Sequence, residues 1–226
     1  MKLDALAKYD TPTITNAMDS LGIAPRSFLG PRIRALAPGA PVVGIAVTCT
    51  MKEQWGGKFS HLEPWLKFLE EIESALLPCV AIFHDDSAVA GREAMIGEGM
   101  ARVMRIAGAV GVICDGSVRD VGQLRGLDLA IWSSGVVVDR GSLRFHQFQI
   151  PVEIDGMQVK PGDLIHADEN GAVVVPMDRA EEIAEAAVAV SAREARLFPM
   201  FAQPDFRVAK LRDFYADALR SARGEF

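Results

Sequence analysis

The spacing of apolar residues predicts alternating helices and strands over most of this chain. Apolar positions three and four residues apart predict helices at 14–21 and 63–77, and residues 98–107 are also expected to be helical. Runs rich in β-branched residues predict buried strands at 42–50, 79–83, 110–114 and 129–132. Strands that alternate with helices in this way indicate parallel βαβ units.

Capping and turn residues predict where these elements begin and end. Thr11 is expected to be an N-cap with Pro12 at the first helical position, and Pro78 to close the helix at 63–77. Glycines and prolines predict a loop at 30–41, and residues 86–96, between a strand and a helix, are also expected to form a loop. A turn at 115–117 then leads into a short predicted helix at 118–124.

The C-terminal half has a different pattern, with short β segments followed by helices. The predicted segments are 136–138, 152–154, 158–160, 163–166 and 172–175, which suggest a compact β-layer. Asp178 is expected to cap a helix over 179–198, and Pro204 to precede a last amphipathic helix that ends near Arg220. We therefore expect a single domain over 1–226 with a helical extension over about 178–226.

Composition and charge narrow the class of protein. Of the 226 residues, 50% are hydrophobic and 24% charged, which is typical of a globular protein and excludes disordered and collagen-like classes. The net charge of −6 disfavours nucleic-acid binding. No stretch is long and apolar enough for a membrane span, so we expect a cytoplasmic protein without a membrane partner. Cys49, Cys79 and Cys114 match no zinc spacing and are expected to be core thiols.

Candidate chemistry lies in two loops that should meet at one edge of the sheet. Gly97, Glu98, Gly99 and Met100 begin one predicted helix, and Arg119-Asp120 lies near the start of another. Ligands of parallel α/β sheets bind where the strands' carboxyl ends gather. Free amides at a helix N-terminus favour an anion, so a small carboxylate would fit.

Glu98 and Asp120 suit a hard, oxygen-preferring cation such as Mg²⁺, which takes one or two protein carboxylates. From spacing alone, the alternative is that Arg119 and Asp120 form an ion pair on the surface at the start of a helix. Glu98 would then only interact favourably with the dipole of its own helix. Two further residues have open alternatives: His84 as an acid or base, or as a hydrogen-bonded histidine at a strand end, and Trp65 as a pocket residue or as packing.

Two stretches in the middle of the chain, residues 97–101 and 108–120, resemble the signature of the RraA-like family, which includes class II 4-hydroxy-4-methyl-2-oxoglutarate aldolases. Residues 38–48 and 160–176 are similar to the family's early strand and late β-turn-β segment. The resemblance covers roughly residues 11–50 and 79–195. The chain departs from the family at Thr15-Asn16, where Ser-Asp is frequent, and over 51–77 with Trp55, His61 and Trp65.

The resemblance implies an α/β fold, layered α/β/β/α and swivelling-domain-like, with C-terminal helices, assembled as a homotrimer or hexamer. It implies a metal-dependent lyase that cleaves a small 2-oxo acid to pyruvate, with possible oxaloacetate decarboxylation and with Mg²⁺ or Mn²⁺ as cofactor. The alternative that it leaves open is a non-catalytic protein that binds and inhibits a ribonuclease.

The resemblance also implies roles for individual residues. Asp120 would be the direct metal ligand, Arg119 would bind the substrate and its enolate, and Glu98 would hold a water on the metal. The backbone amides that would bind the substrate carboxylate are those of Gly97, Glu98, Gly99 and Met100. Family members bring a glutamate from a neighbouring subunit's C-terminal helix, and Glu194 is the candidate here, with an ordinary solvated glutamate as the alternative.

Overall fold

The computed structural model describes residues 3–24, 26–37, 39–54 and 62–216. A main mixed sheet is ordered β1-β7-β5-β3-β2-β12-β13, and β9 pairs with β2. Its strands are β1 (Arg34–Ala37), β2 (Val42–Glu53), β3 (Cys79–Asp85), β5 (Ala109–Cys114), β7 (Ala130–Ser133), β9 (Leu143–Phe148), β12 (Leu164–Asp168) and β13 (Gly171–Val175). The parallel pairs are β2–β3, β3–β5 and β5–β7, which confirms the predicted parallel units.

Two smaller sheets and the helices complete the fold. The strands β4 (Ala94–Ile96), β6 (Ser117–Val118) and β8 (Gly135–Val136) form a parallel three-stranded sheet, and β10 (Val152–Ile154) pairs with β11 (Met157–Val159). The helices are η1 (Leu3–Lys8), α1 (Thr11–Ser20), α2 (Leu62–Glu73), α3 (Glu98–Ala107), α4 (Val121–Leu124), η2 (Met177–Arg179), α5 (Ala180–Phe201) and α6 (Val208–Phe214). These elements confirm the predicted α/β class with C-terminal helices.

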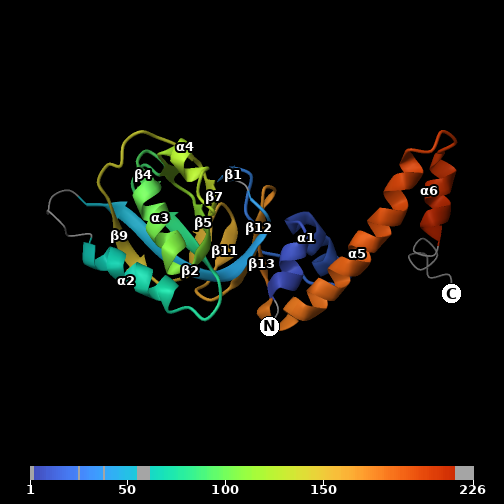
Figure 1. Ribbon diagram of the computed structural model, residues 1–226, viewed down its shortest axis with the longest axis horizontal. Coiled ribbons are helices and arrows are strands. Elements are labelled where there is room, and N and C mark those ends of the chain that lie inside the picture. The colour runs from blue at the N-terminus through green and yellow to red at the C-terminus, as the bar shows by residue number, and fades with distance from the viewer. Residues whose placement is uncertain (1–2, 25, 38, 55–61, 217–226) are drawn as a thin grey trace.

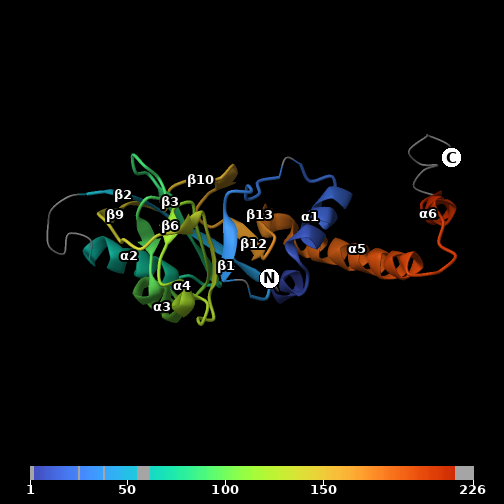
Figure 2. The same cartoon turned by 90° about the horizontal axis from the view of Figure 1, so that it is seen from above.

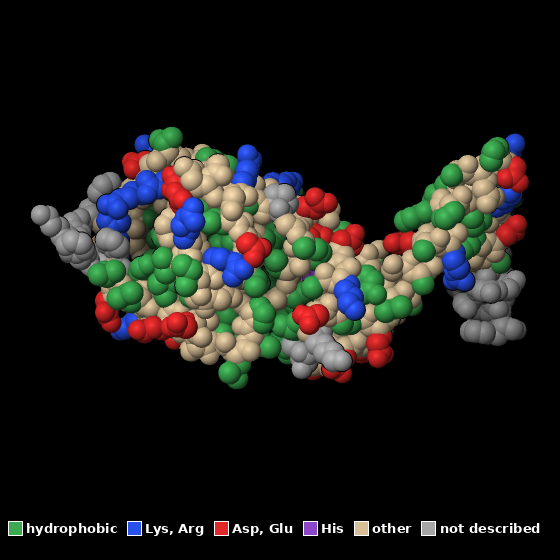
Figure 3. Space-filling model, viewed as in Figure 1, with side chains coloured by type: hydrophobic (Ala, Val, Ile, Leu, Met, Phe, Trp, Pro, Cys, Tyr) green, Lys and Arg blue, Asp and Glu red, His purple; other side chains and the backbone are tan. Residues whose placement is uncertain are grey.

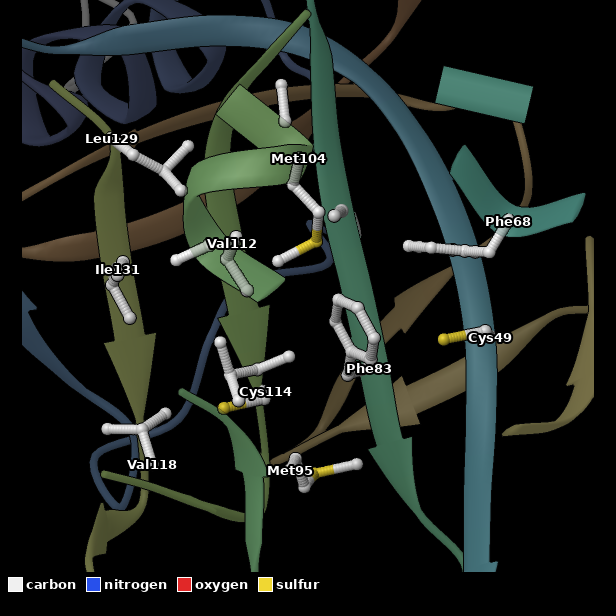
Figure 4. Packing of buried hydrophobic residues seen from close by; sticks show 14 of the residues in the cluster. Cys49, Phe68, Phe83, Met95, Met104, Val112, Cys114, Val118, Leu129 and Ile131 are labelled. Atoms are coloured by element: carbon white, nitrogen blue, oxygen red, sulfur yellow. The ribbon is translucent and has the colours of Figure 1, made fainter. Parts of the chain in front are cut away.

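Apolar side chains cover both faces of the main sheet. On one face α2, α3 and α4 pack against β2, β3 and β5, and the β10–β11 hairpin covers the other face (Figures 1 and 2). In the helix-covered layer, Met104 from α3, Phe83 from β3 and Cys114 from β5 lie together (Figure 4). A period of two along each strand explains this, since alternate residues of β3 and β5 face opposite layers.

A third apolar cluster joins the N- and C-terminal segments. Helices η1, α1 and the first half of α5 pack around β12 and β13. The second half of α5 and α6 extend away from this body (Figure 1). Phe198, Phe201 and Val208 on this arm are exposed by 55%, 47% and 73%. Within the described residues, no helix is long and apolar enough to cross a membrane.

Several predicted helix boundaries were wrong, because neighbouring residues compete to cap or end the same helix. Asp10, rather than Thr11, caps α1, since its side chain accepts from the Thr13 amide. The helix α2 ends at Glu73, before Pro78. Asp178 lies in the turn η2, and the structure shows no side-chain cap there.

Other errors concern short strands that pair with distant partners. Residues 34–37 and 94–96 were predicted as loops but form β1 and β4. Ser117, predicted to end a turn, and Val118, predicted to begin a helix, form β6. The strand β9 was not predicted. The expected compact β-layer is also wrong, because β8, β10–β11 and β12–β13 belong to three different sheets. Pairing partners far along the chain decide these assignments, and local patterning does not show them.

Candidate active site

The first turn of α3 forms one side of the candidate site. Gly97 precedes the helix in extended conformation, and Glu98 is its first residue, as predicted. The amides of Gly99 and Met100 donate to no backbone or side-chain oxygen among the described residues. They are therefore available to an anion at the positive end of the helix dipole.

Arg119 and Asp120 approach this turn because β6 pairs with β4. Ile96 lies opposite Val118, and the Arg119 amide donates to the Ile96 carbonyl at 3.0 Å. Asp120 follows with a φ of +62°, in the left-handed region. Aspartate tolerates this conformation better than most residues, and residues held there concentrate at functional sites.

Gly97 permits a close approach of the two site loops. The Glu98 amide donates to Asp120 Oδ2 at 3.0 Å, and Arg119 Nε lies 3.7 Å from the same oxygen. A Cβ at residue 97 would lie 2.8 Å from Asp120 Oδ2 and 3.0 Å from Arg119 Nε. The structure thus brings together the residues that the sequence placed in one cleft.

One detail of the predicted anion site differs. The Glu98 amide was expected to face the substrate, but it already donates to Asp120. Glu98 itself forms an ion pair with Arg102, with 2.7 Å between Oε1 and Nη2, and its side chain is 33% exposed. The free donors of the turn are therefore those of Gly99 and Met100.

Asp120 offers one free carboxylate oxygen to a divalent cation. Oδ2 is occupied by the Glu98 amide, whereas no described residue donates to Oδ1. Among the described residues, no group of three or more His, Cys, Asp or Glu side chains could hold a metal ion. A cation bound here would rely on Asp120 Oδ1, water and substrate oxygens, which fits Mg²⁺, since it retains several waters.

A cavity of about 280 Å³ lies beside these residues, and Gly97, Gly99 and Arg119 line it. Its apolar lining comes from Met51, Trp65, Met95, Met100, Leu143 and Phe145. Trp65 stacks on Phe145 with 5.3 Å between ring centroids, so it both packs and lines the cavity. Trp55 and His61, which the sequence singled out in the same divergent segment, lie outside the described residues.

Two cavity residues were missed by the sequence interpretation. Arg140 and Arg144 line the cavity from the β8–β9 connection and from β9. Basic side chains gather on this face over β4, β9 and α3 (Figure 3). Arg140 and Arg144 flank the tripeptide Gly-Ser-Leu, which matches no motif, so the pairing of β9 with β2 is what brings them to the site.

His84 has the hydrogen-bonded role that was one of its two alternatives. Its Nδ1 lies 2.5 Å from Asp115 Oδ2, at the ends of β3 and β5. This hydrogen bond raises the pKa of His84, and burial opposes the rise. The three cysteines are free and buried, as predicted, and burial raises the pKa of Cys79 to about 11.

Glu194 is not brought to the site within one chain. It lies on α5, which packs against α1, η1 and η2, while Arg119 and Asp120 lie beside α3. The prediction that Glu194 serves an active site thus requires a second copy of the chain.

Comparison with known proteins places this geometry in a family. A model of the RraA-like family, described as Aldolase/RraA, matches residues 11–174. "Protein DlpA" of Legionella pneumophila is 33% identical over 90 residues, which are 39% of this chain and 15% of that protein. "Putative 4-hydroxy-4-methyl-2-oxoglutarate aldolase" of Shewanella oneidensis is 31% identical over 90 residues, 39% of this chain and 55% of that protein. The chain thus spans less than two thirds of the length of either relative.

A solved structure extends the likeness over most of the fold. Streptomyces coelicolor RraAS2, described as an unusual member of the RNase ES inhibitor RraA protein family, has a TM-score of 0.68 and 30% identity. The match covers 86% of this chain and 95% of that one. Relatives of this protein therefore include one named as an aldolase and one from a family of ribonuclease inhibitors. The family model spans the β-sheet, the α3 turn and the Arg119–Asp120 pair, and the chain belongs to the RraA-like family.

Proposed function

We propose that this protein is a divalent-metal-dependent carbon–carbon lyase that cleaves a 4-hydroxy-2-oxo acid to pyruvate. The observation that carries the proposal is the meeting of Arg119, Asp120 and the free amides of the α3 turn beside one cavity. These groups offer a guanidinium, a carboxylate and an anion-binding turn within one site. The aldolase name of the Shewanella oneidensis relative supports the same chemistry.

Substrate binding follows from the donors that the chain leaves free. The substrate carboxylate would accept from the amides of Gly99 and Met100, where the helix dipole favours negative charge. Asp120 Oδ1 would hold Mg²⁺ or Mn²⁺. When bound, the cation supplies electrophilic stabilisation of the charge that develops on the 2-oxo group.

Cleavage would break the bond between C3 and C4 of the substrate. The electron pair of this bond passes to C3 and is delocalised as the enolate of pyruvate, while the 4-hydroxyl group loses its proton and becomes a carbonyl. Arg119 would stabilise the enolate oxygen. Glu98, held by Arg102, would relay the proton through water to C3. Decarboxylation of oxaloacetate gives the same enolate, so one site would serve both reactions.

The test is pyruvate release, coupled to lactate dehydrogenase and NADH. The substrates are 4-hydroxy-4-methyl-2-oxoglutarate and oxaloacetate, each assayed with Mg²⁺ and with a chelator. Asp120→Ala is expected to abolish metal-dependent turnover, and Asp19→Ala, an exposed carboxylate on α1, serves as a control that removes the same charge. If Asp120→Ala is folded by circular dichroism and as active as the wild type, the assignment fails.

The second candidate is a non-catalytic protein that inhibits a ribonuclease. The likeness to RraAS2 at 30% identity favours it. Absence of pyruvate release from either substrate, together with absence of Mg²⁺ binding, would support this candidate over the lyase. Binding of Mg²⁺ without release would point to another oxo acid.

We also propose that the active form is a homotrimer or a hexamer with sites between subunits. The arm formed by the second half of α5 and α6 extends from the body (Figure 1). It exposes large apolar side chains. Glu194 is on this arm and would reach the site of a neighbouring copy. A monomer by light scattering would contradict this assembly.

A further inference from the structure

One histidine is buried where the N-terminal segment packs on the main sheet. The side chain of His166, on β12, has no solvent exposure, and burial lowers its pKa. Hydrogen bonds to β2 on one side and to β13 on the other hold the backbone of β12 in place. The ring contacts η1 and the first turn of α1, and α1 lies beside β12, β13 and the first half of α5 (Figures 1 and 2).

The hydrogen bonds of this ring define its neutral form. Nε2 lies 3.2 Å from the Leu6 carbonyl, and a carbonyl can only accept, so Nε2 carries the proton. Nδ1 lies 2.9 Å from the hydroxyl oxygen of Thr11, and in the neutral ring it accepts from that hydroxyl. Both ring nitrogens are therefore satisfied without a charge.

A second proton on the ring would reverse the bond to Thr11. Nδ1 would then donate, and the Thr11 hydroxyl would lose the acceptor for its own proton. Among the described residues, the charged groups that act on the ring are the carboxylates of Asp10 and Asp168, and neither forms a hydrogen bond with it. The side chains that β2, β13 and α5 bury around this junction are apolar. Burial of an imidazolium here is unfavourable, because the ion loses its hydration and gains no carboxylate contact.

The short helix η1 is the part of this cover that can open most easily. It is a 3₁₀ helix of six residues, of which Leu3 and Leu6 are buried. A groove of about 300 Å³ lies between it and α5, and Tyr9 and Val188 are among the residues that line this groove. Segments with few buried contacts open locally while a hydrogen-bonded sheet stays intact. Water can therefore reach the ring by detachment of η1, without disruption of β12.

We propose that η1 is a pH-sensitive cover over β12 and α5, which opens when His166 is protonated. At neutral pH the ring holds the Leu6 carbonyl and the Thr11 hydroxyl, and η1 stays closed. In acid the open form is stabilised, since only there is the protonated ring hydrated. Opening exposes apolar side chains of α5 that pack near η1, such as Ala184 and Ala187. The proposal is independent of the lyase function, because this junction lies apart from the α3 turn (Figure 1).

The test is amide hydrogen exchange by NMR at pH 7.5 and pH 5.5, corrected for the intrinsic dependence of exchange on pH. In the open form His166 has its ordinary pKa of about 6.5, so protonation favours opening by up to about tenfold over this interval. The reporters are the amides of Tyr9, which donates to the Leu6 carbonyl, and of Thr11, which donates to Asp168. We expect their protection to fall by about five- to tenfold at pH 5.5, while that of β3 and β5 changes by less than about twofold.

His166→Gln separates this histidine from other titrating groups. The glutamine amide can donate to the Leu6 carbonyl and accept from Thr11, but it takes up no proton in this range. In this variant the protection of Tyr9 and Thr11 should change by less than about twofold between the two pH values. His146→Gln, on β9, is the matched control and should retain the fall seen in the wild type.

If His166→Gln fails to fold, the comparison of η1 with β3 and β5 in the wild type decides the outcome alone. Three results would overturn the inference: equal protection of η1 at the two pH values, an equal fall in η1 and in both strands, or a fall that persists in His166→Gln.

Discussion

Substituting Gly97 by alanine tests whether the site depends on close approach of its two loops. The added Cβ would lie 2.8 Å from Asp120 Oδ2, whereas ordinary contacts begin at 3.4 Å. The carboxylate must then retreat by roughly 0.6 Å, which lengthens its 3.0 Å bond to the Glu98 amide toward 3.6 Å. At that distance the hydrogen bond is lost.

The expected loss of stability is small and the loss of activity is large. A hydrogen bond to this partly exposed carboxylate contributes about 1 kcal/mol. Replacing glycine reduces the entropy of the unfolded chain and offsets about 0.4–1 kcal/mol, because the φ of −133° at Gly97 is open to alanine. A displacement of this order at a reacting centre costs about 100-fold in rate, or about 2.7 kcal/mol.

The assays are urea unfolding and metal-dependent pyruvate release on the same preparations. Gly122→Ala is the matched control, since a Cβ at residue 122 meets nothing within 4 Å. We expect Gly97→Ala to unfold within about 1 kcal/mol of the wild type and to lose about 100-fold in kcat/KM. Wild-type activity in folded Gly97→Ala would refute the reasoning, because the Asp120 carboxylate would then tolerate displacement.

Three further results are expected. In urea unfolding, the free energy of unfolding of Asp120→Asn should lie within about 0.5 kcal/mol of the wild type. Asp120→Ala should be less stable by a further ~1 kcal/mol, because alanine disfavours a φ of +62°. Equal stabilities of the two variants would contradict this. Burial lowers the pKa of His166, whose ring contacts Thr11 and the Leu6 carbonyl, so the contribution of His166 to stability should be lost as pH falls below 6.5, where the unfolded chain gains the proton first. Urea unfolding at pH 7 and pH 5 checks this, and His166→Gln should show a weaker dependence. Glu194→Gln should lower kcat without changing the oligomeric state seen by light scattering; unchanged kcat would remove Glu194 from the proposed site.

Local sequence signals predicted the elements that carry the candidate residues. Helix α3 begins at Glu98 and ends before Gly108, as predicted, because the glycine adopts a φ of +114° that terminates the helix. The β-branched run at 42–50 lies within β2, and the three cysteines are buried. Periodicity and turn residues act within a few positions, so they can be recognised without the rest of the fold.

Contacts between distant segments decided the short strands and the residues that line the cavity. The pairing of β4 with β6 involves strands of three and two residues, which have too few positions to show a pattern, yet it places Arg119 against Ile96. The same holds for β9, whose pairing with β2 brings Arg140 and Arg144 to the cavity.

The sequence by itself therefore determined the alternating α/β architecture, the free amides of the α3 turn and the family resemblance that links Glu98 to Arg119 and Asp120. Only the tertiary structure showed that the Glu98 amide donates to the Asp120 carboxylate and that Arg140 and Arg144 line the cavity. The physical reason is range: helix starts and buried strands arise from neighbours along the chain, whereas a cavity wall arises from segments whose proximity depends on the whole packed sheet.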